Sequence, residues 1–275
     1  MLIQRASAEH FQETISTMKD KRLRTFAYVE KAAAIAVALC VWQIASMWLS
    51  QEILLASPIS VLKALLQILS EKDCFATLGY SLGRILLGFF LGLLVGAVFA
   101  YGSFISHLFE TFLWPYMALI RITPVVSFII LCLVWLSGRN LSIFIAFLMV
   151  LPVVYINLLA GFRGLDPKLS QMAEVFCLNK KQMLLYIYLP QLMKPLIAAL
   201  HVSIGLAFKA GMAAEVIGIP KGSIGRRLYD AKLYLATDEL FAWTFLIIVM
   251  SLVCEKLIVI ALHALGKRTE GLLWK

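Results

Sequence analysis

Long apolar runs separated by short polar segments dominate the pattern along the chain. Several runs reach the roughly 20 residues that an α-helix needs to cross a ~30 Å hydrocarbon core, and none shows the apolar–polar alternation of a membrane β-strand. The pattern therefore predicts an all-α, polytopic membrane protein. Its six transmembrane helices are predicted near Ala32–Leu49, Ser81–Tyr101, Phe112–Leu136, Leu141–Ala160, Gln191–Ala213 and Leu240–Leu262.

The distribution of basic residues predicts how these spans are oriented. Of 275 residues, 61% are hydrophobic, against about half in a soluble domain, and the mean hydropathy is +0.88. With the N-terminus inside, the inner segments hold thirteen Lys and Arg and the outer segments seven. This asymmetry places both termini in the cytoplasm. Because the net charge of +9 is spread over the N-terminus and the loops, it does not indicate a nucleic-acid surface.

The polar segment 165–189, between the fourth and fifth spans, carries two helix signals. Asp166 followed by Pro167 is typical of a helix start, and Asn179 and Gln182 have the spacing of a capping box at a second short helix. The first helix would carry one apolar stripe, formed by Leu169, Met172, Ala173 and Phe176. The segment is either a hairpin that lies on the bilayer or a knob that docks into a partner. The residue pattern alone leaves both open.

Three charged residues in or beside the spans are candidates for a translocation pathway. Arg121 lies in the third span in the neighbourhood of two prolines, which free backbone carbonyls and can kink a helix. It either faces a pathway or snorkels to an interface or a structural acid. Lys209 and Glu215 are six residues apart, so they do not share one helical face, and each is a separate candidate for lining the pathway.

Glycines mark two further features. Gly88, Gly92 and Gly96 recur every four residues in the second span, a spacing that predicts close helix packing within the subunit. The stretch 205–230 contains five glycines and one proline. This composition predicts a non-spanning outer segment that packs over the cavity, where irregular backbone is tolerated.

No catalytic motif accompanies these features. The sequence lacks a GxxxxGK[ST] phosphate loop, an HExxH motif and a GxSxG motif. The five cysteines and four histidines are isolated from one another, without metal-ligand spacing. The chain is predicted not to be an enzyme and to hold no cofactor or metal of its own.

The end of the polar segment resembles a motif of bacterial ABC importers. Their membrane subunits carry Glu-Ala-Ala, three residues, Gly, nine residues, Ile, one residue and Leu-Pro. Here Ile187, Leu189 and Pro190 match the end of the motif, and Pro190 separates the loop from the fifth span. Gln171, Met172 and Ala173 stand where Glu-Ala-Ala would be, and Cys177 replaces the Gly, although Cys adopts a positive φ less easily.

The resemblance extends over most of residues 30–265 and is specific to the nitrate/sulfonate/taurine-type permeases. Any one matching stretch is short, but their order and spacing agree with that family. The stretches are LASPISVLKAL (55–65), SLGRILLGFFLGLLVGAVFAYG (81–102), WPYMALIRITPVVSFIILCLVW (114–135), INLLAGFRGLDPKL (156–169), AAEVIG (213–218) and GSIGRRLYDAKLYLATDELFAW (222–243).

The resemblance implies a type I ABC importer permease fold in a bacterial inner membrane. Residues 1–31 would be a cytoplasmic segment, 32–76 the first transmembrane helix with an outer segment, 77–262 the permease core and 263–275 a cytoplasmic tail. The coupling helices at 165–189 would seat in a cleft of a separate ATPase subunit. That contact would use Gln171, Met172, Ala173, Glu174, Phe176, Cys177, Lys180, Lys181, Leu189 and Pro190.

The partners implied are the ATPase, which binds ATP and Mg²⁺, an extracytoplasmic solute-binding protein, a second permease copy in a homodimer, and the lipid bilayer. Relatives carry nitrate, sulfonates, taurine, bicarbonate or pyrimidine-type thiamine precursors. A small anion is expected here, and a thiamine-precursor pyrimidine is the alternative. From other classes, an ATPase-independent secondary transporter is disfavoured by the lack of internal repeats. An intramembrane enzyme is disfavoured by the lack of a catalytic cluster.

Overall fold

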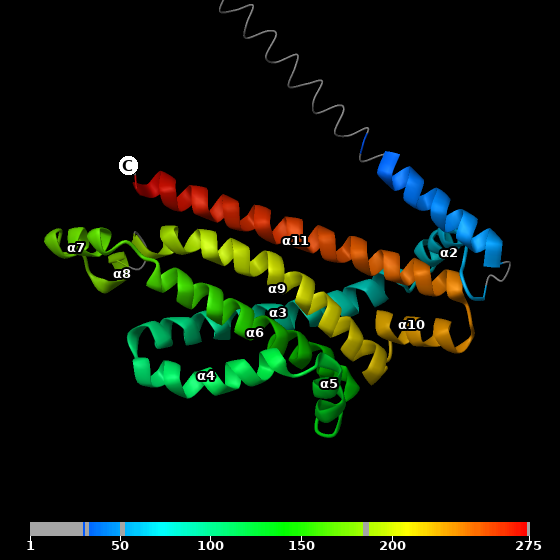
Figure 1. Cartoon of the computed structure of the whole chain (residues 1–275), viewed down its shortest axis with the longest axis horizontal. Coiled ribbons are helices and arrows are strands. Elements are labelled where there is room, and N and C mark those ends of the chain that lie inside the picture. The colour runs from blue at the N-terminus through cyan, green and yellow to red at the C-terminus, as the bar shows by residue number, and fades with distance from the viewer. Residues whose placement is uncertain (1–29, 31–32, 50–52, 184–186, 274–275) are drawn as a thin grey trace, which may run out of the picture.

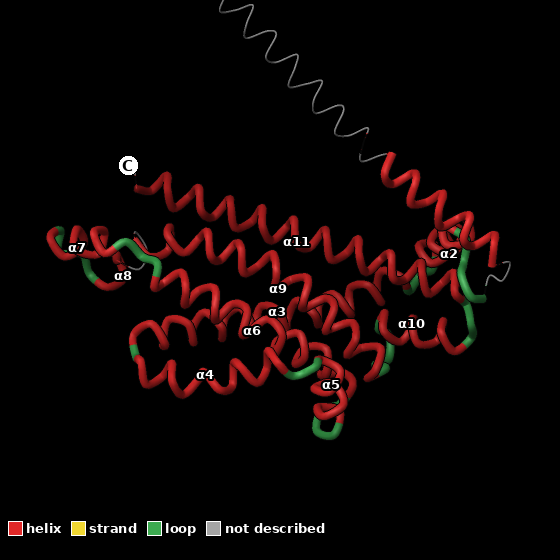
Figure 2. Tube along the Cα trace, viewed as in Figure 1, coloured by secondary structure: helices red, strands yellow, loops and turns green. Residues whose placement is uncertain are grey.

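The computed structural model describes residues 30, 33–49, 53–183 and 187–273, which form helices and connecting turns without any strand (Figure 1, Figure 2). The predicted all-α class is therefore confirmed for this part of the chain. Among the described residues, four helices are long and apolar enough to cross a membrane, and a bent helix pair brings the number to five if it counts as one span. The four are α3 (Cys74–Ile105), α6 (Gly138–Arg163), α9 (Leu189–Gly218) and α11 (Thr237–Leu273).

Shorter helices lie at the ends of this bundle. An apolar helix, Ala33–Leu49, occupies the position of the predicted first span. At one end lie α2 (Pro58–Ser70) and α10 (Ile224–Leu233), and at the other end lie α7 (Pro167–Val175) and α8 (Lys180–Met183) (Figure 1). We refer to these as the α10 end and the α7–α8 end.

Side-chain caps explain where the helices of the α10 end begin. The Ser57 hydroxyl accepts a hydrogen bond from the Ser60 N–H at 3.1 Å, and proline follows in the first turn of α2. The Ser223 hydroxyl accepts from the Arg226 N–H at 3.0 Å and caps α10. Each cap satisfies a backbone donor that the first turn of a helix leaves unpaired.

The third predicted span is not one continuous helix. In place of one helix over Phe112–Leu136, the chain forms α4 (His107–Ile122) and α5 (Val125–Leu133), which meet at an angle of 101° and count as one broken span or as two helices. Pro124 is the N-cap of α5, and Thr123 before it has extended backbone (φ −68°, ψ 130°). Proline lacks an N–H and disfavours helical backbone in the preceding residue, so the helix ends there.

The non-spanning outer segment begins later than predicted. The prediction that all of 205–230 lies outside a span is wrong for its first half, because α9 continues to Gly218. The helix ends at Ile219, which adopts a left-handed conformation (φ 44°) and donates its N–H to the Glu215 carbonyl at 2.8 Å. Within the helix, Gly211 allows a close approach to α3, since a Cβ there would lie 2.8 Å from Ile85 Cγ1.

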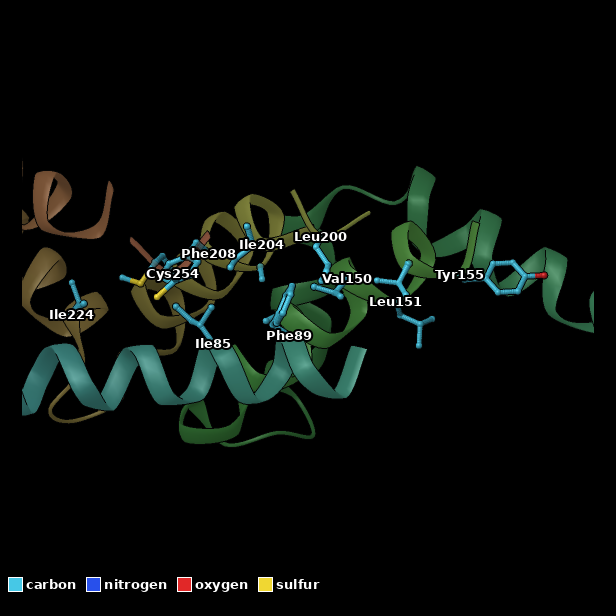
Figure 3. Packing of buried hydrophobic residues seen from close by; sticks show 14 of the residues in the cluster. Ile85, Phe89, Val150, Leu151, Tyr155, Leu200, Ile204, Phe208, Ile224 and Cys254 are labelled. Carbon is cyan, nitrogen blue, oxygen red and sulfur yellow. The ribbon is translucent and has the colours of Figure 1, made fainter. Parts of the chain in front are cut away.

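The core lies where α3, α6 and α9 pack against one another. The most extensive helix contacts in the described structure are between α6 and α9 and between α3 and α6. Ile85 and Phe89 of α3, Val150 of α6 and Ile204 of α9 are all buried and point toward one another in Figure 3. This packing makes the three helices one rigid unit, on which the remaining helices are arranged.

The glycine repeat of α3 allows this contact, as predicted. A Cβ on Gly88 would lie 2.3 Å from the Ile143 carbonyl oxygen, one on Gly92 would lie 2.8 Å from Val150 Cβ, and one on Gly96 would lie 3.0 Å from the Leu151 carbonyl oxygen. The glycines therefore serve helix packing within the subunit.

Candidate functional site

The segment 165–189 contains a helical hairpin whose caps are those that the sequence predicts. The Asp166 carboxylate accepts from the Lys168 N–H at 2.9 Å at the start of α7. Asn179 and Gln182 form a reciprocal pair: the Asn179 side chain accepts from the Gln182 N–H at 2.9 Å, and the Gln182 side chain accepts from the Asn179 N–H at 3.0 Å. Both helix starts are thus stabilised by local side chains.

The hairpin exposes apolar side chains at the α7–α8 end. Met172 is 46% exposed, Val175 80% and Phe176 69%, and Gln171 and Cys177 beside them are also exposed. Exposed apolar side chains gathered on one short hairpin are typical of a surface that docks into a partner.

Of the other residues predicted to contact the ATPase, the structure describes the side chains of only two. Leu189 and Pro190 form the first turn of α9 and are partly buried. They therefore connect the hairpin to a long helix of the core. The side chains of Ala173, Glu174, Lys180 and Lys181 lie outside the described part of the structure.

Cys177, at the position of the motif's glycine, adopts a left-handed conformation with φ 54°. A side chain with a Cβ is strained by about 1–2 kcal/mol in this region. We expect Cys177→Gly to relieve the strain and to stabilise the hairpin by about 1 kcal/mol, reduced by the greater freedom of glycine in the unfolded chain. Slower hydrogen exchange of the α7 amides would show it. Cys177→Ser keeps the Cβ and is the control, so equal exchange in both variants would contradict the strain.

A cavity of about 560 Å³ lies between α4 and α6. Arg121, one residue before the end of α4, lines it together with Trp114 of α4 and Tyr155 of α6. Arg121 is exposed and makes no hydrogen bond or ion pair with another described residue. A cation without a protein partner in a cavity of a membrane protein can bind an anion or line a hydrated pathway.

An ion pair between α4 and α6 forms part of the cavity wall. Arg163, the last residue of α6, donates from Nη2 to the Glu110 carboxylate of α4, and both residues line the cavity. The sequence does not predict this pair, because Arg163 falls in a polar loop and Glu110 belongs to no motif. No local signal joins the two residues, which are 53 positions apart.

The other two pathway candidates do not join Arg121. Lys209 is exposed on α9 and is absent from the lining of this cavity. Glu215 is fully buried near the α10 end, where its carboxylate accepts from the Ser81 hydroxyl at 2.6 Å. Arg121 thus lines a cavity, Lys209 lies on an exposed helix face, and Glu215 belongs to a buried polar cluster.

Comparisons with known proteins show the family to which this chain belongs. Residues 75–271 match the family model described as the binding-protein-dependent transport system inner membrane component. A Bacillus subtilis (strain 168) protein whose name assigns it to aliphatic sulfonate transport is 27% identical over 210 residues, which cover 75% of each chain. The taurine transport system permease protein of Escherichia coli (strain K12) is 26% identical over 241 residues, covering 85% of this chain and 86% of the relative.

Two further matches extend the comparison. A nitrate import permease protein of Synechococcus elongatus is 26% identical over 229 residues, covering 78% of this chain and 79% of the relative. A solved structure described as an amino acid ABC transporter with histidines has a TM-score of 0.52 and 19% identity over 68% of this chain and 90% of its own, which shows a shared fold. With the family model matching well over half of the sequence, this chain belongs to the inner membrane components of binding-protein-dependent transport systems.

Proposed function

We propose that this chain is the type I ABC importer permease that forms the pathway for a small anion, with six membrane spans and both termini in the cytoplasm. The six would be the helix Ala33–Leu49, the bent pair α4–α5 and the four long helices. The excess of Lys and Arg in the inner segments supports the orientation. In this orientation the α7–α8 end would lie inside the cell and the α10 end outside.

The exposed hairpin is the contact for a separate ATPase. Its apolar side chains would enter a groove of the ATPase, and α9, which begins directly after Pro190, would transmit the motion to the core. ATP and Mg²⁺ would be bound by the ATPase. A solute-binding protein would deliver the substrate at the α10 end, and a second copy of this chain would complete the pathway as a homodimer.

The single observation that favours an anion is the cavity between α4 and α6. Arg121 lies in its wall without a partner among the described residues, whereas Arg163 is paired with Glu110. A guanidinium group presents several N–H donors in a plane, which matches the oxygens of a sulfonate, nitrate or carboxylate group. The names of the relatives, which include taurine and nitrate transport, point to the same chemistry.

The geometry also suggests how the ion pair contributes to transport. Glu110 and Arg163 join the start of α4 to the end of α6, beside the turn that enters the hairpin. When the ATPase subunits close on ATP, movement of the hairpin would shift the end of α6 relative to α4. The inner mouth of the cavity would then close as the outer end opens, and hydrolysis would reset it.

Arg121→Gln is expected to lower substrate uptake by at least about tenfold, a loss of about 1.4 kcal/mol of favourable interaction with the anion. Uptake of labelled taurine, an alkanesulfonate and nitrate would be measured in vesicles containing the ATPase and the binding protein. Arg121→Lys keeps the charge and should retain part of the activity. Lys256→Gln, an exposed cation on α11 outside the cavity, is the control.

Three outcomes would contradict the proposal. Unchanged anion uptake by Arg121→Gln would remove the residue from the pathway. Transport of a thiamine-precursor pyrimidine in place of these anions would favour the alternative substrate. Uptake that continues without the ATPase would indicate a secondary transporter.

A further inference from the structure

A buried polar cluster joins four helices near the α10 end. Ser81 and Arg84 come from α3, Ser142 from α6 and Glu215 from α9, and the backbone of the first turn of α10 completes it. Ser81, Ser142 and Glu215 are fully buried, and Arg84 is 8% exposed. Charged side chains buried this deeply need partners for each polar atom.

One side of the cluster holds α10 in place. The Glu215 Oε2 atom accepts from the Ser81 hydroxyl at 2.6 Å and from the Gly225 N–H at 3.4 Å. The Ser81 hydroxyl in turn accepts from the Ile224 N–H at 2.9 Å. The close approach of α10 to α9 requires glycine at position 225, because a Cβ on Gly225 would lie 2.4 Å from Glu215 Cβ.

The other side of the cluster leaves two charged atoms without a partner in the described structure. Arg84 donates from Nε to the Ser142 hydroxyl at 3.3 Å and from Nη1 to the Tyr80 hydroxyl. Its Nη2 atom and the Glu215 Oε1 atom are buried and make no hydrogen bond to the protein. Buried polar atoms of this kind usually have a partner, so a small ligand between them is the physical expectation.

The charges of the two groups define what this ligand is. The Ser142 hydroxyl lies beside both Arg84 and the Glu215 carboxyl, yet no direct ion pair between the two is formed in the described structure. A cation would be repelled by Arg84, and a simple anion would offer no donor to the Glu215 carboxyl. A neutral molecule that accepts from the guanidinium and donates to the carboxylate satisfies both, and water does so with two hydrogen bonds of about 2.9 Å.

We propose that Arg84 Nη2 and Glu215 Oε1 bind one buried water molecule, and that this hydrated cluster is a latch that holds α10 on α3, α6 and α9. If these helices separated, the Arg84 and Glu215 side chains would lose hydrogen-bond partners in a medium of low dielectric, which is unfavourable. The α10 end therefore moves as one body with the core. That the α10 end lies at the outer opening of the pathway rests on the proposed function, whereas the latch itself does not.

Ser81→Ala tests the latch. The variant removes the acceptor of the Ile224 N–H and one donor to Glu215, so hydrogen exchange of the α10 amides, in the full chain in lipid nanodiscs, should become at least about tenfold faster. Ser103→Ala is the matched control, since Ser103 is also buried on α3 but bonds to Tyr155. Unchanged exchange at α10 in Ser81→Ala, or equal acceleration in the control, would overturn the latch.

A double-mutant cycle tests the coupling between the two charges. Arg84→Met and Glu215→Gln each leave the other charge uncompensated, so each should lower the thermal unfolding midpoint by on the order of 10 °C. The double variant should lose clearly less than the two decrements together. Additive decrements would show that the groups do not interact. Neither this result nor the exchange result depends on transport, so the latch and the proposed function can fail separately.

The water itself is tested by electron cryo-microscopy of the unsubstituted complex, at a resolution that shows ordered water. A density peak within hydrogen-bond distance of both Arg84 Nη2 and Glu215 Oε1 is expected. Ordered side chains with no peak between them would overturn the water site.

Discussion

A Phe176→Asp chain is expected to reach the membrane in normal amount and to lose its ATPase. Phe176 follows α7 and is 69% exposed, so the substitution removes no buried contact within the chain. In an apolar groove of a partner, the new carboxylate would be desolvated without a counter-charge. Aromatic residues of this kind contribute about 2 kcal/mol or more at a contact, and adding a buried charge raises the loss. Co-purification of the ATPase with the tagged permease should fall at least about thirtyfold.

Leu233→Asp is the matched control for this experiment. Leu233 is 63% exposed on α10, at the opposite end of the molecule, so it tests the same change of an exposed apolar side chain into a carboxylate. It should retain the ATPase. If Phe176→Asp binds the ATPase as firmly as the control does, the hairpin is not the docking surface.

The hairpin itself could be predicted from the sequence because its caps act over two or three residues. Asp166 bonds to the Lys168 N–H, and Asn179 and Gln182 bond to one another. Such contacts depend on local sequence and little on the rest of the fold. The backbone at Cys177 was left open by the resemblance, because the family has glycine there and cysteine adopts a positive φ less easily. The structure shows the left-handed conformation.

The break between α4 and α5 could not be predicted from local sequence alone, because two prolines are candidates for it. Two prolines lie in the predicted third span, yet Pro115 sits inside a continuous α4 whereas the chain turns by 101° at Pro124. Either proline removes one backbone hydrogen bond. Whether the helix continues depends on which neighbouring groups replace that bond and on how the two parts pack, and neither is visible in a single sequence.

The sequence could not predict the buried cluster around Glu215 or the Glu110–Arg163 ion pair, because their members are far apart along the chain. Ser81 and Glu215 are 134 residues apart, and Glu110 and Arg163 are 53 residues apart. The position of Glu215 just beyond the fifth predicted span signals a role, but the packing of α3 against α9 determines its partners. The sequence therefore indicated which residues carry charge in the membrane, while the fold decided that Arg121 lines a cavity and Glu215 does not.

Gly88→Val is expected to prevent the chain from folding stably, because α3 and α6 are in contact at this point. A Cβ on Gly88 would lie 2.3 Å from the Ile143 carbonyl oxygen and 2.8 Å from Ala146 Cβ. The nearest obstacle is backbone, which cannot rotate away, so the two helices must separate and lose contacts along their length. Overpacking typically costs about 1–3 kcal/mol where side chains can adjust, and here the cost exceeds that range. The folded fraction, measured by size-exclusion chromatography in detergent, should fall below about one tenth of the parent.

Gly83→Val is the control that separates the loss of packing against α6 from the change in helix propensity when valine replaces glycine. Gly83 lies on the same helix, and a Cβ there would meet no atom within 4 Å. Both variants replace glycine by the same β-branched residue in α3, so they share any difference in helix propensity. Only the contact with α6 distinguishes them. Gly83→Val should therefore fold like the parent, and equal losses in the two variants would mean that the helix backbone, and not its close approach to α6, requires glycine.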